Sequence, residues 1–208
     1  RHIPVVNEDG QVVDVVLLSE VIKDYELPLT AVVMAGGFGS RLRPLTEDFP
    51  KPMLPVGDRP LLEIIIEQLS KAGIQRVNLT THYMGEMIAH HFGDGRDFGV
   101  DLHYVEEDQP LGTAGALGLL DSPDQPLIVI NGDILTRVDF RAMLAFHEEH
   151  GADMTVAVRQ HEFRVPYGVI EMEGVAIKDI KEKPMVRHSV NAGIYVLNPE
   201  VCALIPAD

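Results

Sequence analysis

The sequence predicts an α/β protein built on a largely parallel sheet with helices on both faces, and three observations support that prediction. From Thr30 onward, short apolar runs alternate with segments of helical periodicity, a pattern typical of parallel strands joined by helices. Several runs lead into loops rich in glycine or acidic residues, as strands do at a ligand-binding edge. The 208 residues are 46% hydrophobic and 24% charged, as expected of a globular chain.

The first 27 residues predict a β-hairpin followed by a short helix. Asp9 and Gly10 form a turn signal between the apolar runs 3–6 and 11–18, and a helical pattern covers 19–25. Two strands and one short helix bury too little surface to be stable alone. We therefore expect residues 1–27 to be an appendage or the end of another domain, and residues 28–208 to form the main domain.

The main domain begins with four strand–helix pairs. Pro60 suits a first helical turn, and Gly73 is a typical stop signal for the helix between them. In chain order the predicted elements are strand 30–35, helix 59–73, strand 76–82, helix 84–92, strand 100–107, a small-residue helix at 112–120, strand 126–133 and helix 139–151. Four further strands, at 154–160, 167–173, 175–183 and 190–197, make the second half richer in strands.

The charge excludes several classes of partner. A net charge of −15 disfavours nucleic acid and anionic membranes, because both require a basic face. No apolar run approaches the length of a membrane span. A single cysteine, Cys202, excludes a disulfide framework and is compatible with a reducing cytoplasm. We expect a cytoplasmic protein whose phosphate sites, if any, are local exceptions to its acidity.

One such exception is the loop AGGFGSRLRPLTEDFPKP, residues 35–52, directly after the first predicted strand of the main domain. It lacks the G-x-x-x-x-G-K-[ST] string of a Walker A loop, and Leu42 occupies the third glycine position of a dinucleotide fingerprint. Its prolines exclude a regular helix. Glycine N–H groups together with Arg41 and Lys51 would suit a triphosphate. The loops after strands 100–107 and 126–133 should meet it at the same sheet edge.

Residues 36–52 resemble the signature of the sugar-1-phosphate nucleotidyltransferases, G-G-x-G-[ST]-R-L-x-P-L-T-x-x-x-P-K-P, at every specified position. The resemblance continues through PLGTAGAL, NGD, YGVIE, KEKP and NAGIYV in the family's order. It implies a Rossmann-like sheet of the GT-A type found in nucleotide-diphospho-sugar transferases. It also implies the reaction: a sugar 1-phosphate attacks the α-phosphorus of a nucleoside triphosphate and releases pyrophosphate.

The resemblance implies three catalytic residues. Arg41 would hold the β- and γ-phosphates, Lys51 would reach the α-phosphate, and Asp133 of NGD would bind Mg²⁺. The family's second metal carboxylate comes from a later segment that is not found in these 208 residues, so the nucleotidyltransferase domain, 28–208, is expected to be incomplete at its C-terminus.

The remaining site residues also follow from the resemblance. Related thymidylyl- and uridylyltransferases read the base with a glutamine at the position of Glu107. A carboxylate there would accept from both the N1–H and the N2 amino group of guanine, so GTP is favoured over dTTP or UTP. The expected nucleotide-binding set is Ala35, Gly36, Gly37, Gly39, Ser40, Glu107, Gly112 and Thr113. The expected sugar-phosphate set is Gly168, Glu182, Lys183 and Asn191.

Several alternatives stay open at this point. The sugar would be of mannose or glucosamine type, the base could be thymine or uracil, and a catalytically incomplete regulatory homologue is a further reading. Residues 1–27 resemble the closing part of a CBS domain, a module that occurs in pairs and often binds adenine nucleotides. A homo-oligomer, and an adenine nucleotide at a complete CBS pair, are therefore further partners to consider.

Overall fold

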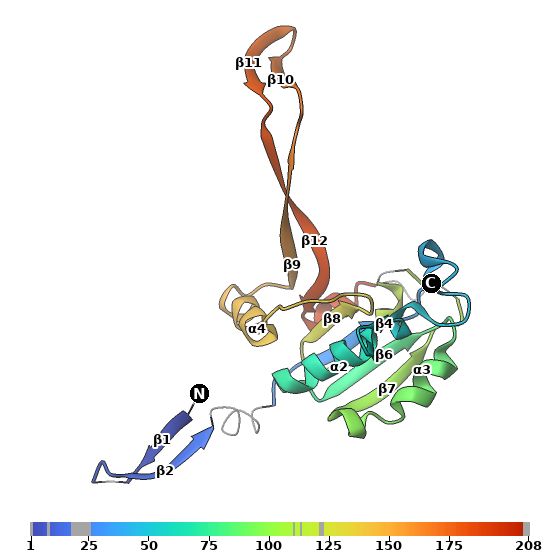
Figure 1. Cartoon of the computed structure of the whole chain (residues 1–208), viewed down its shortest axis with the longest axis vertical. Helices are drawn as coiled ribbons and strands as arrows, with labels where there is room; N and C mark the ends of the chain where they lie inside the picture. The colour runs from blue at the N-terminus through green and yellow to red at the C-terminus, as the bar shows by residue number, and fades with distance from the viewer. Residues whose placement is uncertain are drawn as a thin grey trace.

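A computed structural model describes residues 2–7, 9–17, 26–109, 111–112, 114–120 and 123–205. Its body is a six-stranded sheet (Figure 1). The strands lie in the order β7 (Asp101–Glu106), β6 (Arg76–Thr81), β3 (Thr30–Met34), β8 (Leu127–Asn131), β12 (Met185–Leu197) and β9 (Met154–Arg164). The first four are mutually parallel, whereas β12 runs antiparallel to both β8 and β9.

The predicted parallel sheet with helices is confirmed, and its two faces are covered unequally. On one face, alternate side chains such as Val33 join a large buried cluster with α2 (Leu61–Ala72), α3 (Gly85–Phe92) and α4 (Phe140–Glu149). On the other face, Val32 belongs to a smaller cluster. That face is covered by the 3-10 helix η4 (Gly115–Leu119) and the four-residue α5 (Pro199–Cys202).

Helix α2 shows why the sequence predicts these elements well. Its buried side chains are Leu62, Ile65, Ile66 and Leu69, spaced three or four apart on one face of the helix. Gly73 ends the helix with φ of 88°, a left-handed conformation that costs glycine no steric strain. A short hairpin of β4 (Pro55–Val56) and β5 (Arg59–Pro60) precedes the helix, so the proline stands just before its first turn.

The predicted helix over 112–120 is wrong in type and in length. The structure has only a 3-10 helix over Gly115–Leu119. Gly112 has φ of 75°, which is incompatible with a right-handed helix. Three glycines among these nine residues weaken the helix that the alanines and leucines favour, so the local loop geometry prevails here.

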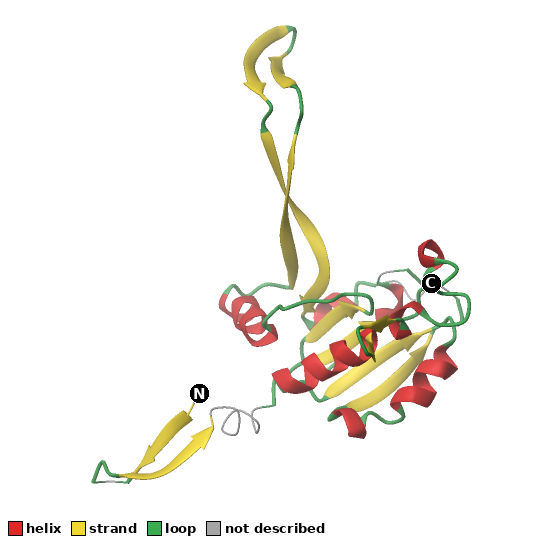
Figure 2. Cartoon of the chain, viewed as in Figure 1, coloured by secondary structure: helices red, strands yellow, loops and turns green. Residues whose placement is uncertain are grey.

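The second half contains an arm, defined here as residues 158–190, that projects from the sheet (Figures 1 and 2). β9 and β12 are both longer than predicted and pair along the arm's stem. β10 (Gly168–Glu173) and β11 (Ala176–Glu182) form a separate antiparallel hairpin at its far end. Most side chains of the arm are exposed, Val175 at 98%.

The predicted N-terminal hairpin is present as β1 (His2–Val6) and β2 (Val12–Leu17), which form a sheet of their own. Gly10 adopts φ of 75° in the turn. The helix predicted over 19–25 lies outside the described residues. Within the described part of the chain, no helix is long and apolar enough to cross a membrane.

Candidate active site

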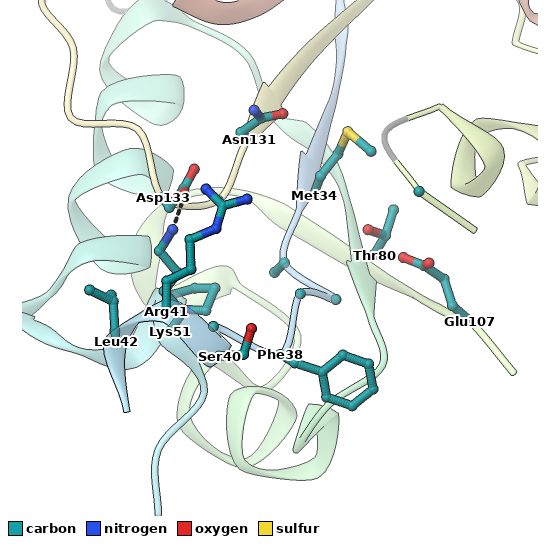
Figure 3. A pocket seen from close by; sticks show the side chains of 17 residues that line it. Met34, Phe38, Ser40, Arg41, Leu42, Lys51, Thr80, Glu107, Asn131 and Asp133 are labelled. Carbon is teal, nitrogen blue, oxygen red and sulfur yellow. Dashed lines mark hydrogen bonds and ion pairs between the residues drawn. The ribbon is translucent and has the colours of Figure 1, made fainter. Parts of the chain in front are cut away.

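A cavity of about 470 Å³, the central pocket, opens at the carboxyl ends of β3, β6 and β8 (Figure 3). This is the edge at which the sequence predicts three loops to meet. The pocket is lined by Met34, Ala35, Gly36, Gly37, Phe38, Gly39, Ser40, Arg41, Leu42, Lys51, Pro52, Thr80, Glu107, Gly112, Asn131, Gly132 and Asp133. The structure therefore brings together every predicted catalytic and nucleotide-binding residue except Thr113, which lies outside the described residues.

The glycine-rich loop keeps its shape through one glycine and one threonine. Gly39 has φ of 62°, and a Cβ there would lie 2.9 Å from Thr46 Cγ2 and 3.0 Å from Lys51 Cβ. The buried Thr46 hydroxyl donates a hydrogen bond to the Gly39 carbonyl, at 2.9 Å. The loop thus folds back on itself and places the start of η1 (Ser40–Leu42) and of η2 (Lys51–Met53) against one pocket.

One side of the pocket is charged. The Lys51 Nζ donates to Asp133 Oδ2, and the Arg41 guanidinium lies beside this ion pair (Figure 3). The side chains of Lys51 and Asp133 are 33% and 35% exposed, so a ligand can reach both. Two cations against one carboxylate make this side positive on an acidic chain, which suits an anionic phosphate group.

Asp133 owes its position to the preceding glycine. The Gly132 N–H donates to the Met34 carbonyl at 2.8 Å, and a Cβ on Gly132 would lie 2.7 Å from that same oxygen. Because the clash would be with backbone, no side-chain rotation could relieve it. The turn after β8 is therefore held against the end of β3, and Asp133 follows directly into the pocket.

The other side of the pocket is formed around Glu107. Its side chain is 6% exposed, and its Oε2 accepts a hydrogen bond from the Leu111 N–H at 3.2 Å. A Cβ on Gly36 would lie 2.8 Å from Oε1, so the loop approaches this carboxylate as closely as glycine permits. Each carboxylate oxygen has two lone pairs, and the carboxylate therefore retains the capacity to accept from a ligand.

The pocket suits a metal that arrives with a phosphate ligand. The described residues contain no cluster of three or more histidine, cysteine or acidic side chains that could hold an ion by themselves. Mg²⁺ usually takes one or two carboxylates and fills its other positions with waters and substrate phosphates. Asp133 on the positively charged side of the cavity fits that second arrangement.

The predicted sugar-phosphate residues are placed differently. Gly168, Glu182 and Lys183 lie on the arm and are not among the described residues that line the pocket. Gly168 pairs with Glu182, and the Lys183 Nζ lies 3.8 Å from Glu182 Oε1. Lys183 has φ of 45°, a costly conformation for a residue with a side chain. Their role in sugar binding stays a prediction.

Asn191 lies closer to the pocket, at the bulge where the arm joins the sheet. Its Oδ1 accepts from the Gly193 N–H at 2.8 Å, and its Nδ2 donates to the Tyr195 hydroxyl at 2.7 Å. A Cβ on Gly193 would lie 2.7 Å from Nδ2 of Asn131, a pocket residue. The bulge thus links the base of the arm to the wall of the pocket.

Several lining residues are absent from the predicted set, notably Phe38, Thr80 and Asn131. Thr80 and Asn131 are polar residues at the carboxyl ends of apolar strands, and that signal could have identified them. Phe38 occupies the variable position of the G-G-x-G motif, so the motif gives no reason to select it. Only the position of Phe38 in the folded loop identifies it as a lining residue.

Comparison with known proteins identifies this arrangement. Residues 30–207 match the family model described as nucleotidyl transferase. The chain is 36% identical over 183 residues to mannose-1-phosphate guanylyltransferase 1 of Arabidopsis thaliana, covering 83% of this chain and 51% of that protein. It is 37% identical over 179 residues to the mannose-1-phosphate guanylyltransferase catalytic subunit beta of Drosophila melanogaster, covering 82% and 48%.

The fold has counterparts among solved structures. A crystal structure of HddC from Yersinia pseudotuberculosis aligns with a TM-score of 0.65 and 26% sequence identity, covering 86% of this chain and 80% of that one. The chain spans about half the length of the curated relatives that it matches.

Proposed function

The chain belongs to the nucleotidyl transferase family, and on that premise we propose that it transfers GMP from GTP to a hexose 1-phosphate, with release of pyrophosphate. One observation carries the proposal: Arg41, Lys51, Asp133 and Glu107 line a single pocket at the carboxyl edge of the sheet. The first three provide for a triphosphate, and the fourth provides an acceptor for a base. The names of the curated relatives support guanine as the base and mannose as the sugar.

The chemistry requires positioning more than acid–base catalysis. An oxygen of the sugar phosphate forms a bond to the α-phosphorus, the bond between that phosphorus and the bridging oxygen breaks, and pyrophosphate leaves with the electron pair. A phosphate monoester has its second pKa near 6, so the nucleophile is already largely a dianion at neutral pH and needs no general base. Cations that neutralise charge and align the reactants therefore account for most of the catalysis.

Each charged residue has a distinct role in this scheme. Arg41 would bind the β- and γ-phosphates and stabilise the departing pyrophosphate, since its planar fork matches phosphate oxygens. Lys51 would contact the α-phosphate as a point charge from its place beside Asp133. Asp133 would hold Mg²⁺, which when bound neutralises phosphate charge and orients the triphosphate.

Specificity would be divided between the pocket and the arm. Glu107 would accept from the N1–H and N2 amino group of guanine, a pair of donors that thymine and uracil lack. Glu182 would bind sugar hydroxyls and Lys183 the sugar phosphate. For these residues to act at the pocket, the far end of the arm must lie nearer to it in the ternary complex than it does here.

The decisive experiment is a pyrophosphate-release assay with the intact protein. GTP, dTTP, UTP, CTP and ATP are each combined with mannose, glucosamine and glucose 1-phosphate, with MgCl₂ or with EDTA. We expect turnover with GTP and loss of it in EDTA. Turnover only with dTTP or UTP would assign the thymidylyl- or uridylyltransferase alternative. No turnover with any combination of nucleoside triphosphate and sugar 1-phosphate would favour the hypothesis of a catalytically incomplete regulatory homologue.

A matched pair of loop arginines makes the assay specific. Arg41 lines the pocket, whereas Arg43, two residues on, is exposed and is not among the described lining residues. We expect Arg41→Ala to lower kcat/KM by about 10²- to 10³-fold, as removal of a transition-state donor does. Arg43→Ala should stay within about threefold of the wild type. Equal losses in the two variants would contradict the role given to Arg41.

We further propose that residues 1–27 are the closing part of a CBS domain and that the protein is cytoplasmic. Among the described strands, β1 and β2 pair only with each other, and this hairpin supports the first proposal by its form alone. Calorimetric titration of the intact protein with AMP, ADP and ATP tests it. Binding that a pocket variant such as Arg41→Ala leaves unchanged would support a separate nucleotide site, and no binding would argue against one.

A further inference from the structure

An exposed aromatic residue lies at the central pocket. Phe38 is 45% exposed and is one of the residues that line the pocket. Exposed phenylalanine is unfavourable in water, and at a cavity it commonly marks a surface on which a ligand packs. The resemblance to the family motif assigns nothing to this position, which is the variable one in G-G-x-G.

Two neighbouring side chains hold the Phe38 ring. Its centroid lies 5.3 Å from that of His82, edge to face at 87°, and 5.4 Å from that of Tyr83, tilted at 50°. Both supports follow directly after β6. With these contacts on one side and 45% of the side chain exposed, the ring has a surface left for a further partner.

The supports are themselves anchored to the two walls of the pocket. The His82 Nδ1–H donates to the Glu107 carbonyl at 2.6 Å. The Tyr83 hydroxyl lies 3.3 Å from the Thr46 carbonyl and 3.2 Å from the Glu47 carbonyl, to which it can donate. His82 therefore joins the backbone of the base-reading residue to the aromatic ring, and Tyr83 joins the ring to the glycine-rich loop.

The location of the ring indicates which part of a nucleotide it would meet. In Figure 3, Phe38, Thr80 and Glu107 lie on the side of the pocket away from Arg41, Lys51 and Asp133. The latter group suits phosphates, so the former side is left for the base. The buried Thr80 Oγ1 has no hydrogen-bond partner among the described residues, and such a group is usually satisfied by a ligand or water.

We propose that Phe38 is the stacking wall of the base subsite and that His82 is a positioning residue that fixes this wall beside Glu107. The inference rests on the proposed function and extends it: Glu107 would select the base by its edge, whereas Phe38 would bind the face of any base. Loss of one aromatic stacking partner typically weakens binding by about 5- to 100-fold and depends little on the base.

Phe38→Ala and Phe38→Tyr are compared with Phe146→Ala. Phe146 on α4 is 52% exposed and stacks on His150 with centroids 4.0 Å apart, outside the pocket, so it controls for loss of an exposed phenylalanine stacked on histidine. Phe38→Ala should raise the KM for GTP by about 5- to 100-fold. Phe38→Tyr should keep the KM for GTP within about threefold of the wild type. The KM for pyrophosphate in the reverse reaction reports on the phosphate side of the pocket, and it should change less than twofold in both Phe38 variants. Phe146→Ala should change neither constant.

Inosine triphosphate (ITP) lacks the 2-amino group of GTP. It therefore distinguishes the stacking role of Phe38 from the hydrogen-bonding role of Glu107. Phe38→Ala should weaken GTP and ITP by the same factor, whereas Glu107→Gln should change the ratio between them. His82→Leu should raise the KM for GTP less than Phe38→Ala does, and should add nothing in the Phe38→Ala background, since coupled residues are non-additive. Full additivity of the two substitutions would overturn the positioning role of His82.

Equilibrium binding keeps the inference testable without turnover. The dissociation constants of GTP and of pyrophosphate are measured by calorimetry for the wild type and Phe38→Ala. A selective loss of GTP affinity supports the stacking wall even if no sugar 1-phosphate is turned over, in which case only the proposed function fails. An unchanged GTP constant, an equal loss for pyrophosphate, or no GTP binding by the wild type would overturn the stacking wall.

Discussion

The six-stranded sheet and the arm contain similar apolar residues but bury them very differently. In the body, Val32, Val33 and Ile66 have no exposed surface, because helices cover the sheet on the two faces. On the arm, Ile170, Ile177 and Ile180 are each more than half exposed, since the hairpin has strand partners but no covering layer. The same residue types therefore stabilise the body through burial and contribute far less along the arm.

This difference separates the two halves of the proposed site. The predicted phosphate and base residues stand on loops that the core positions, and they line one pocket. The predicted sugar-phosphate residues Gly168, Glu182 and Lys183 stand on the arm, where most side chains are exposed. The comparison predicts that substitutions in the body affect catalysis or stability strongly, and that those on the arm affect mainly the sugar substrate.

The largest effect should come from the carboxylate in the pocket. We expect Asp133→Asn to lower kcat/KM by about 10³-fold, because the proposed ligand of Mg²⁺ loses its charge. Asp101→Asn is the control, since Asp101 begins β7 at the opposite edge of the sheet. Steady-state pyrophosphate release measures both. Near-normal activity of Asp133→Asn would contradict the catalytic role proposed for Asp133 and its pocket.

The next effect concerns stability and tests the burial contrast directly. Ile66→Ala should lower the free energy of unfolding by about 2–5 kcal/mol, since it empties a fully buried position. Ile180→Ala, at a side chain that is 61% exposed, should change it by no more than about 0.5 kcal/mol. Urea denaturation followed by circular dichroism measures both. A large loss from Ile180→Ala would show that the arm is packed in solution.

A smaller effect should mark the arm as part of the sugar site. Lys183→Ala should raise the KM for the sugar 1-phosphate by about tenfold, the expected loss of one charged hydrogen bond, with little change in the KM for GTP. Lys178→Ala removes the same charge from an exposed position on β11 and is the control. If Lys183→Ala and Lys178→Ala raise this KM equally, the effect comes from the loss of positive charge on the arm and not from a specific contact of Lys183 with the sugar phosphate.

The smallest effects should come from exposed ion pairs, with opposite pH dependence in the two regions. On α2, the hydrogen bonds from Lys71 and then Arg59 lower the pKa of Glu67. The interactions of Glu67 therefore stabilise the fold at pH values above the ordinary carboxyl pKa. This contribution is lost as the pH falls through the lowered pKa of Glu67. On the arm, the hydrogen bond to Glu171 raises the pKa of Lys181. That contribution is present below the ordinary lysine pKa and is lost as the pH rises through the raised value.

Thermal unfolding across pH tests this pairing. Glu67→Gln should lower Tm at pH 7 by about 1 °C or less and converge with the wild type in acid. Glu171→Gln should show a similarly small difference at pH 7 that disappears in strong alkali. Differences that are independent of pH in either variant would mean that the ion pairs are not their cause.

Much of the fold was predictable because it depends on local signals. The spacing of Leu62, Ile65, Ile66 and Leu69 predicts α2, and the glycine that follows predicts its end. The 112–120 segment was mispredicted because its composition does not reveal the positive φ of Gly112. The lengths of β9 and β12 were underestimated, since their outer parts pair with one another without the buried, alternating pattern that marks a strand.

By itself, the sequence predicted candidate phosphate-binding residues and where the strands that present them end. Glycine N–H groups with Arg41 and Lys51 suit a triphosphate chemically, and the family motif adds Asp133. Only the tertiary structure decided which of the predicted residues share a cavity. It placed Phe38, His82 and Glu107 together although they come from three separate segments, and it placed Lys183 away from them. Such proximity arises from the packing of the sheet and the path of the loops, which no local pattern encodes.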